Sequence, residues 1–588
     1  MADPTHVLAA RVQDAIVAAY GERYRDADPL IRPSSFADYQ ANVALSLGKR
    51  LGQTPREVAA VIADRLEVGD LCEPPEVSGP GFINLTLRDD WISASATSLL
   101  ADSRLGIDLA AEPQTIVVEY SSPNVAKEMH VGHLRTTIVG DALARILVFL
   151  GHHVIRDNHL GDWGTPFGML IEHLLDVGEH SAEADLLRTD PNRFYTDARS
   201  KFDSDPAFVD RARNRLVLLQ GGDPATLTIW QEVVDHSKEY LNDTYRLLRV
   251  TLTDDDIRGE SFYNDMLSGT ADELVAKGLA VTSDGALCVF PAGFTGRDGS
   301  PLPVIIRKSD GGWNYSTTDL ATVRYRVDKL NVDRAIYVVG SDQTLHFQMV
   351  FAVANEAHWI PPGTSFEHAP IGMVQGTDGG KLRTREGDTP KLSDLLAEAL
   401  VQARAILDEV DAPFSGDELD AVAEAVGIGA VKYADLSTSR ESTYIFDLDR
   451  MISFRGNTGP YLQYATARIR SIFRKLDQND TGATSAVLAD VVVADVVVAE
   501  PAERALALRL LGFGAAVASV AESTEPHRLC GYLFDVASLF TTFYEQCPVL
   551  KAPSDEVRSS RLALCALTLR VLTLGLDDLL GVPIPEQM

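Results

Sequence analysis

The chain has 588 residues, with 53 basic and 84 acidic side chains and a formal net charge of −31. A chain of this length exceeds one hydrophobic core, so three or four domains are expected, and its composition is ordinary for a soluble globular protein. The charge argues against nucleic-acid binding unless basic residues gather locally, because exposed charges are screened beyond about 8 Å at physiological salt.

Cysteine usage and hydropathy limit the cellular compartments in which the protein is expected. The 5 cysteines never form a C-x-x-C pair, which fits a reducing cytoplasm and argues against bound zinc and disulfides. The N-terminus carries Asp3, Arg11 and Asp14 where a secretory signal needs a clean apolar run. The most apolar window, 562–580, is broken by charged residues, so no stretch is expected to span a membrane. We expect a cytoplasmic protein without a membrane partner.

The first region, 1–112, alternates helical and strand patterns. Apolar residues recur at helical spacing over 7–17, 43–51 and 58–66. A short strand over 82–87 follows the turn Ser78-Gly79-Pro80-Gly81. These patterns predict a small α+β domain.

The second region, 113–410, begins with a strand, a polar loop and a long amphipathic helix, over 115–120, 121–129 and 130–150. That order is the first unit of a Rossmann-like nucleotide-binding α/β fold. Further strands are predicted at 304–306, 335–339 and 371–374, between helical segments. The acidic stretch of about 170–300 is interpreted as an insertion in this catalytic domain.

The third region, 411–588, is almost wholly helical in pattern. The exception is 477–500, where a polar start gives way to the near-repeat Ala-Asp-Val-Val-Val. This segment is interpreted as a connection between helices and is given no function. We expect an all-α domain.

The loop before the first long helix of the α/β region ends in His130-Val131-Gly132-His133. A helix N-terminus offers unpaired N–H groups and a positive dipole end, which suits a triphosphate. Gly132 leaves room for a base or ribose against the backbone, and His130 and His133 can donate to phosphate oxygens. The alternatives are chance occurrence and a metal site, but no third metal ligand has suitable spacing. Nucleotide binding is favoured.

This string is similar to the HIGH signature of class I aminoacyl-tRNA synthetases. The flanking Ser-Pro-Asn-x-Ala-Lys and Leu134-Arg135, and the block 158–168, resemble the arginine enzymes in particular. The likeness runs through nearly the whole chain. It implies a monomer that activates L-arginine with Mg²⁺–ATP and transfers it to the 2′-hydroxyl of the terminal adenosine of tRNA(Arg). It also assigns Gly161, Asp162 and Gly340 to ATP binding.

An arginine pocket needs carboxylates, because the guanidinium is a cationic planar fork of donors. The segment 313–321 places Tyr315 and Asp319 four residues apart, on one face of a helix start. The resemblance implies that these two and Glu119 hold the guanidinium, while Asn124 and Gln343 hold the α-amino and carboxylate groups. The implied arginine-binding set is Glu119, Ser122, Asn124, Tyr315, Asp319 and Gln343. Alternatively, Asp319 caps a helix and Tyr315 is a half-buried aromatic.

The mobile KMSKS loop of class I synthetases matches Lys381-Leu382-Arg383-Thr384-Arg385, in which only the first lysine is retained. Many arginine enzymes carry a lysine upstream of the HIGH-like motif instead, and Lys127 fits that arrangement. The resemblance therefore implies that Lys127, Lys381, Arg383 and Arg385 act on ATP. A solvated charge run is the alternative.

One stretch is basic without an acidic residue, between Arg450 and Lys475, and such local charge is what phosphate contact needs. It resembles the start of the family's anticodon-binding domain, and the N-terminal region resembles its module for the tRNA elbow. Aromatics near the C-terminus could stack on bases, although half of them are expected in the core. The candidate tRNA contacts are Phe82, Asn84, Arg455, Tyr461, Arg468, Arg470, Phe543 and Tyr544.

Three other functions are compatible with parts of this pattern. A small-metabolite nucleotidyltransferase with an H-x-G-H motif is much shorter and lacks the basic helical C-terminus. A synthetase-like RNA-binding module without activity should have lost His130, His133 or the pocket acids, and all are present. A biosynthetic or resistance role for arginyl-tRNA cannot be separated by sequence, nor can a requirement for tRNA in activation.

Overall fold

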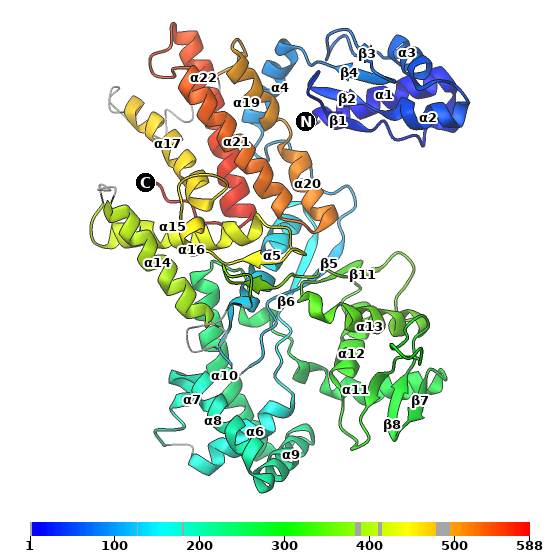
Figure 1. Ribbon diagram of the computed structural model, residues 1–588, viewed down its shortest axis with the longest axis vertical. Helices are drawn as coiled ribbons and strands as arrows, with labels where there is room; N and C mark the ends of the chain where they lie inside the picture. The colour runs from blue at the N-terminus through cyan, green and yellow to red at the C-terminus, as the bar shows by residue number, and fades with distance from the viewer. Residues whose placement is uncertain are drawn as a thin grey trace.

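A computed structural model describes residues 3–125, 127–178, 181–380, 382, 390–409, 414–477 and 494–588. The N-terminal module lies above the central sheet on the right and the end of the chain lies above it on the left, while two groups of elements extend below that sheet (Figure 1). The predicted fold class is confirmed: an α/β protein with an α+β N-terminal part and an all-α C-terminal part.

The N-terminal part packs helices on a small antiparallel sheet. The strands are β1 (Ile31–Pro33), β2 (Tyr39–Ala41), β3 (Glu76–Ser78) and β4 (Phe82–Leu85), in the order β1-β2-β4-β3. The helices are α1 (Pro4–Tyr20), η1 (Glu22–Tyr24), α2 (Val43–Leu51) and α3 (Pro55–Arg65). Local sequence sets these starts: Thr54 and Glu57 form a capping box before α3, and Asp3 caps α1. Only β4 was predicted among the strands.

The central sheet is parallel, in the order β11-β10-β5-β6. Its strands are β5 (Thr115–Glu119), β6 (His153–Asp157), β10 (Arg334–Tyr337) and β11 (Ser365–His368). The long helix α5 (Val131–Phe149) connects β5 to β6, and parallel neighbours need such a crossover connection. The sequence predicted β5, α5 and β10 and missed β6 and β11. The predicted strand at 304–306 lies in a separate sheet, and that at 371–374 is reduced to β12 (Val374–Gln375), which pairs with β13 (Tyr444–Ile445).

The region between β6 and β10 forms two groups. The first is helical, and three of its helices share one start signal, an aspartate N-cap followed by proline: Asp190, Asp205 and Asp223. Its members are α6 (Thr165–Val177), α7 (Leu186–Thr189), α8 (Pro191–Ser204), α9 (Pro206–Gln220) and α10 (Pro224–Leu247). The second joins an antiparallel sheet to helices, and comprises η2 (Asp254–Asp256), η3 (Glu260–Tyr263), α11 (Asn264–Ala276), β7 (Ala280–Ser283), β8 (Ala286–Val289), β9 (Val304–Arg307) and α12 (Tyr315–Asp328). After β10 come η4 (Ser341–Gln343) and α13 (Thr344–Glu356), and α13 packs against α12.

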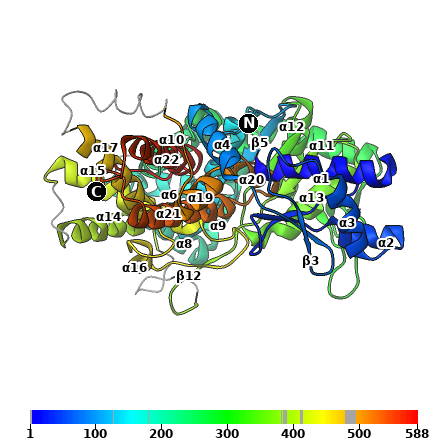
Figure 2. The ribbon, with the colours of Figure 1, turned by 90° about the horizontal axis from the view of Figure 1, so that it is seen from above.

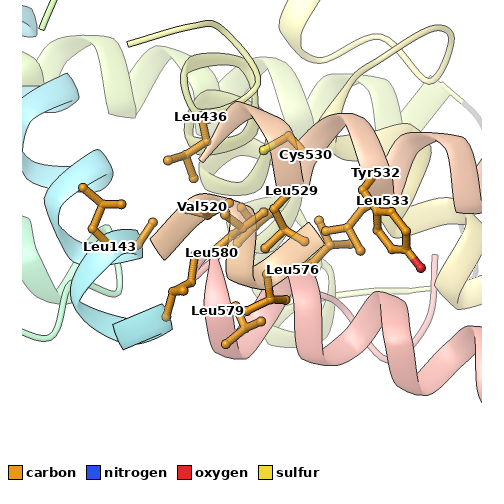
Figure 3. Packing of buried hydrophobic residues seen from close by; sticks show 14 of the residues in the cluster. Leu143, Leu436, Val520, Leu529, Cys530, Tyr532, Leu533, Leu576, Leu579 and Leu580 are labelled. Atoms are coloured by element: carbon orange, nitrogen blue, oxygen red, sulfur yellow. The ribbon is translucent and has the colours of Figure 1, made fainter. Parts of the chain in front are cut away.

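The C-terminal part is a helical assembly that shares its core with α5. Figure 3 shows Leu143 of α5 facing leucines of the last helices, including Leu529, Leu576 and Leu580. Burial of these side chains is the main force that joins the assembly to the central sheet. Its elements are α14 (Leu392–Glu409), α15 (Asp417–Leu436), α16 (Leu448–Met451), α17 (Gly459–Asp477), α19 (Pro501–Leu510), α20 (Phe513–Ser523), α21 (His527–Gln546), α22 (Asp555–Thr573) and η5 (Leu574–Leu579).

One helical stretch among the described residues, Pro501–Ser523, is long and apolar enough to cross a membrane. It comprises α19 and α20, which are separate helices that pack against α21. The N-terminal half carries Glu503 and Arg504, and both side chains are ion-paired. Core helices pass the same test of length and composition, and these contacts fit a core helix pair better than a span.

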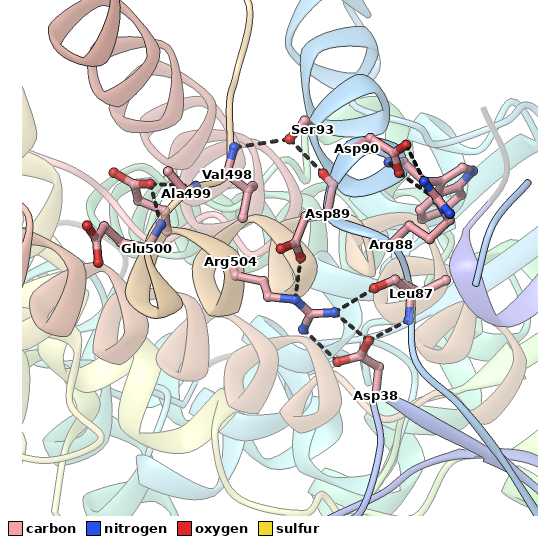
Figure 4. A network of polar contacts seen from close by, with 12 residues as sticks. Asp38, Leu87, Arg88, Asp89, Asp90, Ser93, Val498, Ala499, Glu500 and Arg504 are labelled. Carbon is pink, nitrogen blue, oxygen red and sulfur yellow. Dashed lines mark hydrogen bonds and ion pairs between the residues drawn. The ribbon is translucent and has the colours of Figure 1, made fainter. Parts of the chain in front are cut away.

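Arginines fasten the N-terminal part to the helical part. Arg504 of α19 donates to both carboxylate oxygens of Asp38 at 2.8 and 2.7 Å, to Asp89 at 2.7 Å and to the carbonyl of Leu87 at 2.8 Å (Figure 4). Beside it, the N–H of Val498 donates to Ser93 on α4 (Asp89–Ala101). A guanidinium satisfied on all sides fixes the angle between two elements better than apolar contact alone.

A second arginine, which is fully buried, ties α5 to the helical assembly. Arg135, two residues after His133, donates to Asp435 of α15 at 2.6 Å and to the carbonyls of Gly372 and Ser442, both at 2.9 Å. Gly372 precedes β12, at the base of the segment that contains Lys381. The start of α5, that base and the C-terminal helices are therefore held by one side chain.

Candidate functional site

The turn after β5 has an unusual backbone. Ser121 and Ser122 both have positive φ angles, 68° and 46°, a conformation that costs energy for residues with a side chain. Buried hydrogen bonds hold it: Ser121 Oγ lies 2.8 Å from the hydroxyl of Tyr245 and accepts from Thr137, and Ser122 N–H donates to Asn158 at 3.1 Å. After this turn, Asn124 pairs with Gly161 in a parallel bridge beyond the carboxyl ends of β5 and β6, where α/β enzymes bind ligands.

The two histidines at the start of α5 are fixed by the helix terminus itself. The N–H of Gly132 donates to Nδ1 of His130 at 3.0 Å, and the N–H of His130 donates to Nδ1 of His133 at 3.1 Å. Since Nδ1 accepts in both rings, Nε2 carries the proton and is a donor. Burial lowers the pKa of His133 to about 3, so this ring is neutral at physiological pH. A Cβ on Gly132 would lie 2.8 Å from the His130 ring, so that ring occupies the space over the glycine.

A cavity of about 300 Å³ opens between this segment and the elements below the sheet. It brings together four residues predicted from sequence, since Asn124, Lys127, Gly161 and Tyr315 all line it. Asn124 lies directly on Gly161, where a Cβ would be 2.2 Å from the amide oxygen. Its other walls include Trp163, Phe167, Tyr195, Leu216, Glu260, Lys308 and Trp313.

Acidic groups surround the end of the cavity nearest α12. Asp319 lies one turn after Tyr315 and contacts His346 Nε2 at 2.6 Å, and the His346 ring is 4.8 Å from that of Tyr315. Gln343 is exposed at the start of α13. The pKa of Glu260 is raised to about 7, chiefly by burial; His159 lowers it, and the neighbouring charges of Asp162 and Asp319 add to the rise. The arrangement suits a cationic planar group.

Glu119 stands deeper, at the end of β5, in a buried ion pair. Its Oε2 lies 2.5 Å from Nη2 of Arg326, which also contacts Asp157 at 2.9 Å and lies over the ring of Tyr337. Burial raises the pKa of Glu119. The chain's own guanidinium therefore occupies Glu119 and Asp157, whereas Asp319 contacts the imidazole of His346.

Three other residues predicted for this site have structural contacts. Asp162 is buried and accepts from Ser261 N–H and Oγ at 2.8 and 2.6 Å. Ser122 Oγ accepts from the N–H of His159 at 3.2 Å. Gly340 pairs with Ile371 in a parallel bridge at the same edge of the sheet. These contacts shape the edge on which the cavity lies.

Lys381, Arg383 and Arg385 lie outside the described residues. The downstream end of their segment is described and lies beside the histidines: the N–H of Leu392 donates to Met129, and Lys391 forms a bridge with His130. Lys391 Nζ contacts Glu128 at 2.7 Å.

The acid-free basic stretch contributes to a groove of about 590 Å³ between α17 and the α21–α22 connection. Its lining includes Arg468, Arg474, Lys475, Lys551 and the chain terminus Met588. Arg468 lies between two exposed rings, 4.8 Å from that of Tyr464 and 5.2 Å from that of Tyr544. Cations beside aromatic faces are the common design of sites for single-stranded nucleic acid.

The other candidate tRNA residues differ in how far their side chains are exposed. Phe543 is fully buried against Phe540, so its ring is a core residue and is not accessible to a base. Asn84 is 8% exposed and hydrogen-bonded to Gln40 and Ser78, so it faces its own sheet. The remainder have polar or exposed positions: Arg455 is exposed, Tyr461 bonds Thr541, Arg470 donates to Pro585 and Phe82 is half-buried.

Three residues of interest were missed by the sequence interpretation. Glu260 falls in the stretch interpreted as an acidic insertion, where one more acid carried no signal. His346 stood in a block singled out for Gln343 alone. Phe36, 83% exposed in the N-terminal part, has no neighbouring motif that distinguishes it from a loop residue.

No group of three or more His, Cys, Asp and Glu residues is placed to hold a metal ion among the residues that the structure describes. The 5 cysteines are buried free thiols.

Three family models match the chain in succession. Residues 6–87 match the arginyl-tRNA synthetase N-terminal domain, 95–448 the catalytic domain of class I tRNA synthetases (R), and 462–588 the DALR anticodon-binding domain.

Similar proteins are found at full length. The chain is 60% identical to an arginine–tRNA ligase of Thermobifida fusca and 47% identical to that of Synechococcus elongatus, with 100% of each chain covered. The crystal structure of arginyl-tRNA synthetase from Plasmodium falciparum superposes with a TM-score of 0.84 at 28% identity, and the Thermus thermophilus enzyme with 0.80 at 25%. Both superpositions cover 100% of each chain.

Proposed function

The chain belongs to the arginine–tRNA ligase family of class I aminoacyl-tRNA synthetases, and from that premise we propose how its own residues share the reaction. It activates L-arginine with ATP to arginyl-adenylate and transfers the arginyl group to tRNA(Arg), releasing pyrophosphate and AMP. The observation that carries the assignment of residues is the single cavity that joins Lys127 and Asn124 to Tyr315 and Glu260.

The acidic end of this cavity takes the guanidinium in our proposal. Asp319 and Glu260 accept its N–H groups, and the ring of Tyr315 covers its face, because a planar cation pairs with carboxylates and aromatic faces together. Glu119 acts at the floor, where with Asp157 it holds Arg326. Asn124, Gln343 and the turn at Ser122 receive the α-amino and carboxylate groups at the opposite end.

The first chemical step needs positioning and charge stabilisation rather than a covalent nucleophile. An arginine carboxylate oxygen attacks the α-phosphorus of ATP, the bond to the bridging oxygen breaks, and pyrophosphate leaves with Mg²⁺ brought by the nucleotide. We assign the Nε2–H donors of His130 and His133 and the ammonium of Lys127 to the developing charge. Lys381, Arg383 and Arg385 supply further positive charge from their loop, while Gly132, Gly161, Asp162 and Gly340 shape the nucleotide's surroundings.

In the second step the 2′-hydroxyl of the terminal adenosine attacks the acyl carbon of the adenylate, and AMP leaves. The RNA reaches the cavity while its anticodon lies on the groove beside α17, with Arg468, Tyr461, Arg470 and Arg455 as phosphate or base contacts and Tyr544 as a stacking ring. The N-terminal part contacts the tRNA elbow through Phe82 and the exposed Phe36. Figure 2 places α1–α3 and α17 at opposite sides of the molecule, as two separate contacts with one RNA require.

We propose the division into 1–112, 113–410 and 411–588 as elbow-binding, catalytic and anticodon-binding domains. We also propose that the protein acts as a monomer in the cytoplasm, without zinc. These assignments follow from the family and from buried free cysteines, which are typical of a reducing compartment.

The function is tested by ATP–pyrophosphate exchange with arginine, with and without tRNA(Arg), and with lysine as the control amino acid. The proposal expects exchange that requires arginine and that lysine does not support. Absence of exchange under both conditions would leave an RNA-binding module without activity as the better description.

A further inference from the structure

We propose that Tyr195, on α8 of the helical insertion, is a positioning residue for Lys127 and determines where that ammonium lies at the triphosphate end of the cavity. The inference rests on the proposed role of Lys127 in ATP binding. Lys127 Nζ lies 4.1 Å from the centroid of the Tyr195 ring, and both residues line the substrate cavity. The ring belongs to a helix about seventy residues further along the chain, so the contact is made by the fold and not by the motif.

Separate hydrogen bonds hold the start of α8 against the segment that contains Lys127. Asn192 Nδ2 donates to Glu128 Oε2 at 2.7 Å, and Asn192 Oδ1 accepts from the N–H of Glu128 at 3.1 Å. Residues three apart share a helix face, so Asn192 and Tyr195 both point at this segment. Residue 128 is therefore fixed by an amide on α8 and the side chain of residue 127 by a ring on α8.

Two lysines near the histidines have opposite kinds of partner. Lys391 Nζ contacts the carboxylates of Glu128 at 2.7 Å and Asp190 at 3.5 Å, so its charge is compensated within the protein. Lys127 lies on an aromatic face, which attracts a cation through its quadrupole but carries no net negative charge. A triphosphate can take Lys127 without breaking an ion pair, and the ring has already restricted the long side chain to the cavity.

The structure thus assigns different jobs to the two lysines. Lys391 fastens the downstream end of the loop to the segment before His130, whereas Lys127 is held with its charge available. Because Tyr195 acts through Lys127, its loss should weaken ATP binding while leaving arginine binding unchanged.

The experiment compares Tyr195→Leu with Tyr195→Phe in ATP–pyrophosphate exchange with tRNA(Arg) present, with KM measured separately for ATP and arginine. An exposed cation–π contact corresponds to about a two- to fivefold change in affinity, so Tyr195→Leu should raise the KM for ATP by about that factor. Tyr195→Phe retains the ring and should stay within about 1.5-fold of the parent, by the same reasoning. The KM for arginine should not move in either variant.

A matched control lies on the same helix, where Arg199 lies 5.5 Å from the ring of Phe202. Neither residue lines the cavity, so Phe202→Leu removes a similar contact from α8 and should leave both KM values unchanged. An equal rise in the KM for ATP in this control would mean that loss of α8 packing causes the effect, and would overturn the inference.

The Lys127→Ala background separates the inference from the function on which it rests. There, Tyr195→Leu should have no further effect on the KM for ATP. A persistent effect would mean that the ring touches the nucleotide directly, and Tyr195→Phe as impaired as Tyr195→Leu would mean that the hydroxyl matters; either overturns the positioning role. A Lys127→Ala variant with unchanged KM for ATP would refute the proposed function of Lys127, whereas a defect in Lys127→Ala with none in Tyr195→Leu contradicts only the role of Tyr195.

Discussion

The arginine end of the substrate cavity and the groove beside α17 use charge in opposite ways. At the first, acids gather around one resident arginine, with Glu119 4% and Arg326 0% exposed. At the second, Arg468 is sandwiched between two half-exposed tyrosines, and the neighbouring cations face an open groove. Buried acids make a strong and selective site for a small cation, because low dielectric strengthens each contact. Solvent-exposed basic side chains suit a large polyanion, which makes many weak contacts at once.

This difference accounts for RNA binding by a chain with a net charge of −31. Several arginines form ion pairs within the protein and are not available to RNA, among them Arg135, Arg326 and Arg504. The RNA needs only the few basic residues concentrated at the groove, because charges further than a Debye length away are screened.

The largest effect is expected at the acidic end. Asp319→Asn removes a carboxylate from the proposed guanidinium site and should raise the KM for arginine on the order of 100-fold, since a charge-assisted contact in a partly buried site is lost. Pyrophosphate exchange over a range of arginine concentrations measures it. Asp328→Asn, at the exposed end of the same helix, is the matched control and should be silent. Unchanged arginine activation in Asp319→Asn would refute the pocket.

The next effect is expected at the basic end of the same cavity. Lys127→Ala should lower kcat/KM for ATP about 10- to 100-fold, because an ammonium that contacts phosphate contributes roughly 1.5–3 kcal/mol. The exposed Lys329→Ala variant serves for comparison. Equal behaviour of the two lysine variants would remove the case that Lys127 compensates for the missing second loop lysine.

A pH dependence follows from Glu260. Its pKa of about 7 means that the group is largely protonated below neutrality and becomes a carboxylate above it. If the carboxylate binds the guanidinium, the KM for arginine should fall about tenfold between pH 6 and pH 8, while Glu260→Gln should flatten the profile. The protonated Glu260 stabilises the folded chain relative to the unfolded one, because its pKa is higher in the folded state. The free energy of unfolding should therefore fall as pH rises from about 4.5 to about 7, over the range in which arginine binding improves. A KM for arginine that is independent of pH in the parent protein would contradict this role.

The smallest effect is expected at the groove. Tyr544→Ala should raise the KM for tRNA(Arg) about five- to tenfold, since stacking on one base contributes roughly 1–3 kcal/mol and part of the ring is covered by Arg468. Arginine and ATP constants should not change. The control is Arg558→Ala, an exposed and ion-paired position on α22. An equal rise of the KM for tRNA(Arg) in the control would mean that any substitution in this part of the molecule weakens tRNA binding. It would remove the case for a base contact at Tyr544.

Sequence reasoning reached the parts of the site that are continuous in the chain. The segment from Thr115 to Phe149 has the order strand, loop and helix, so the position of its loop at the sheet edge followed from the pattern. Tyr315 and Asp319 could be paired because a helix places residues four apart on one face.

The remaining parts depend on contacts between distant segments. Glu260 and Tyr195 reach the cavity from an insertion whose fold has no linear signature, and Arg326 neutralises Glu119 across the sheet. The strands β6 and β11 are short, and fewer than half of their residues are apolar, so alternation did not reveal them. Phe543 looked like a candidate base contact because aromatic content says nothing about which face of a helix is buried.

The most direct test of the two-ended cavity is a crystal structure with a non-hydrolysable analogue of arginyl-adenylate. The account predicts the guanidinium between Asp319 and Glu260, covered by the Tyr315 ring, and the phosphate within hydrogen-bonding distance of the Nε2 atoms of His130 and His133. A guanidinium bound elsewhere, or a phosphate at the acidic end, would contradict it.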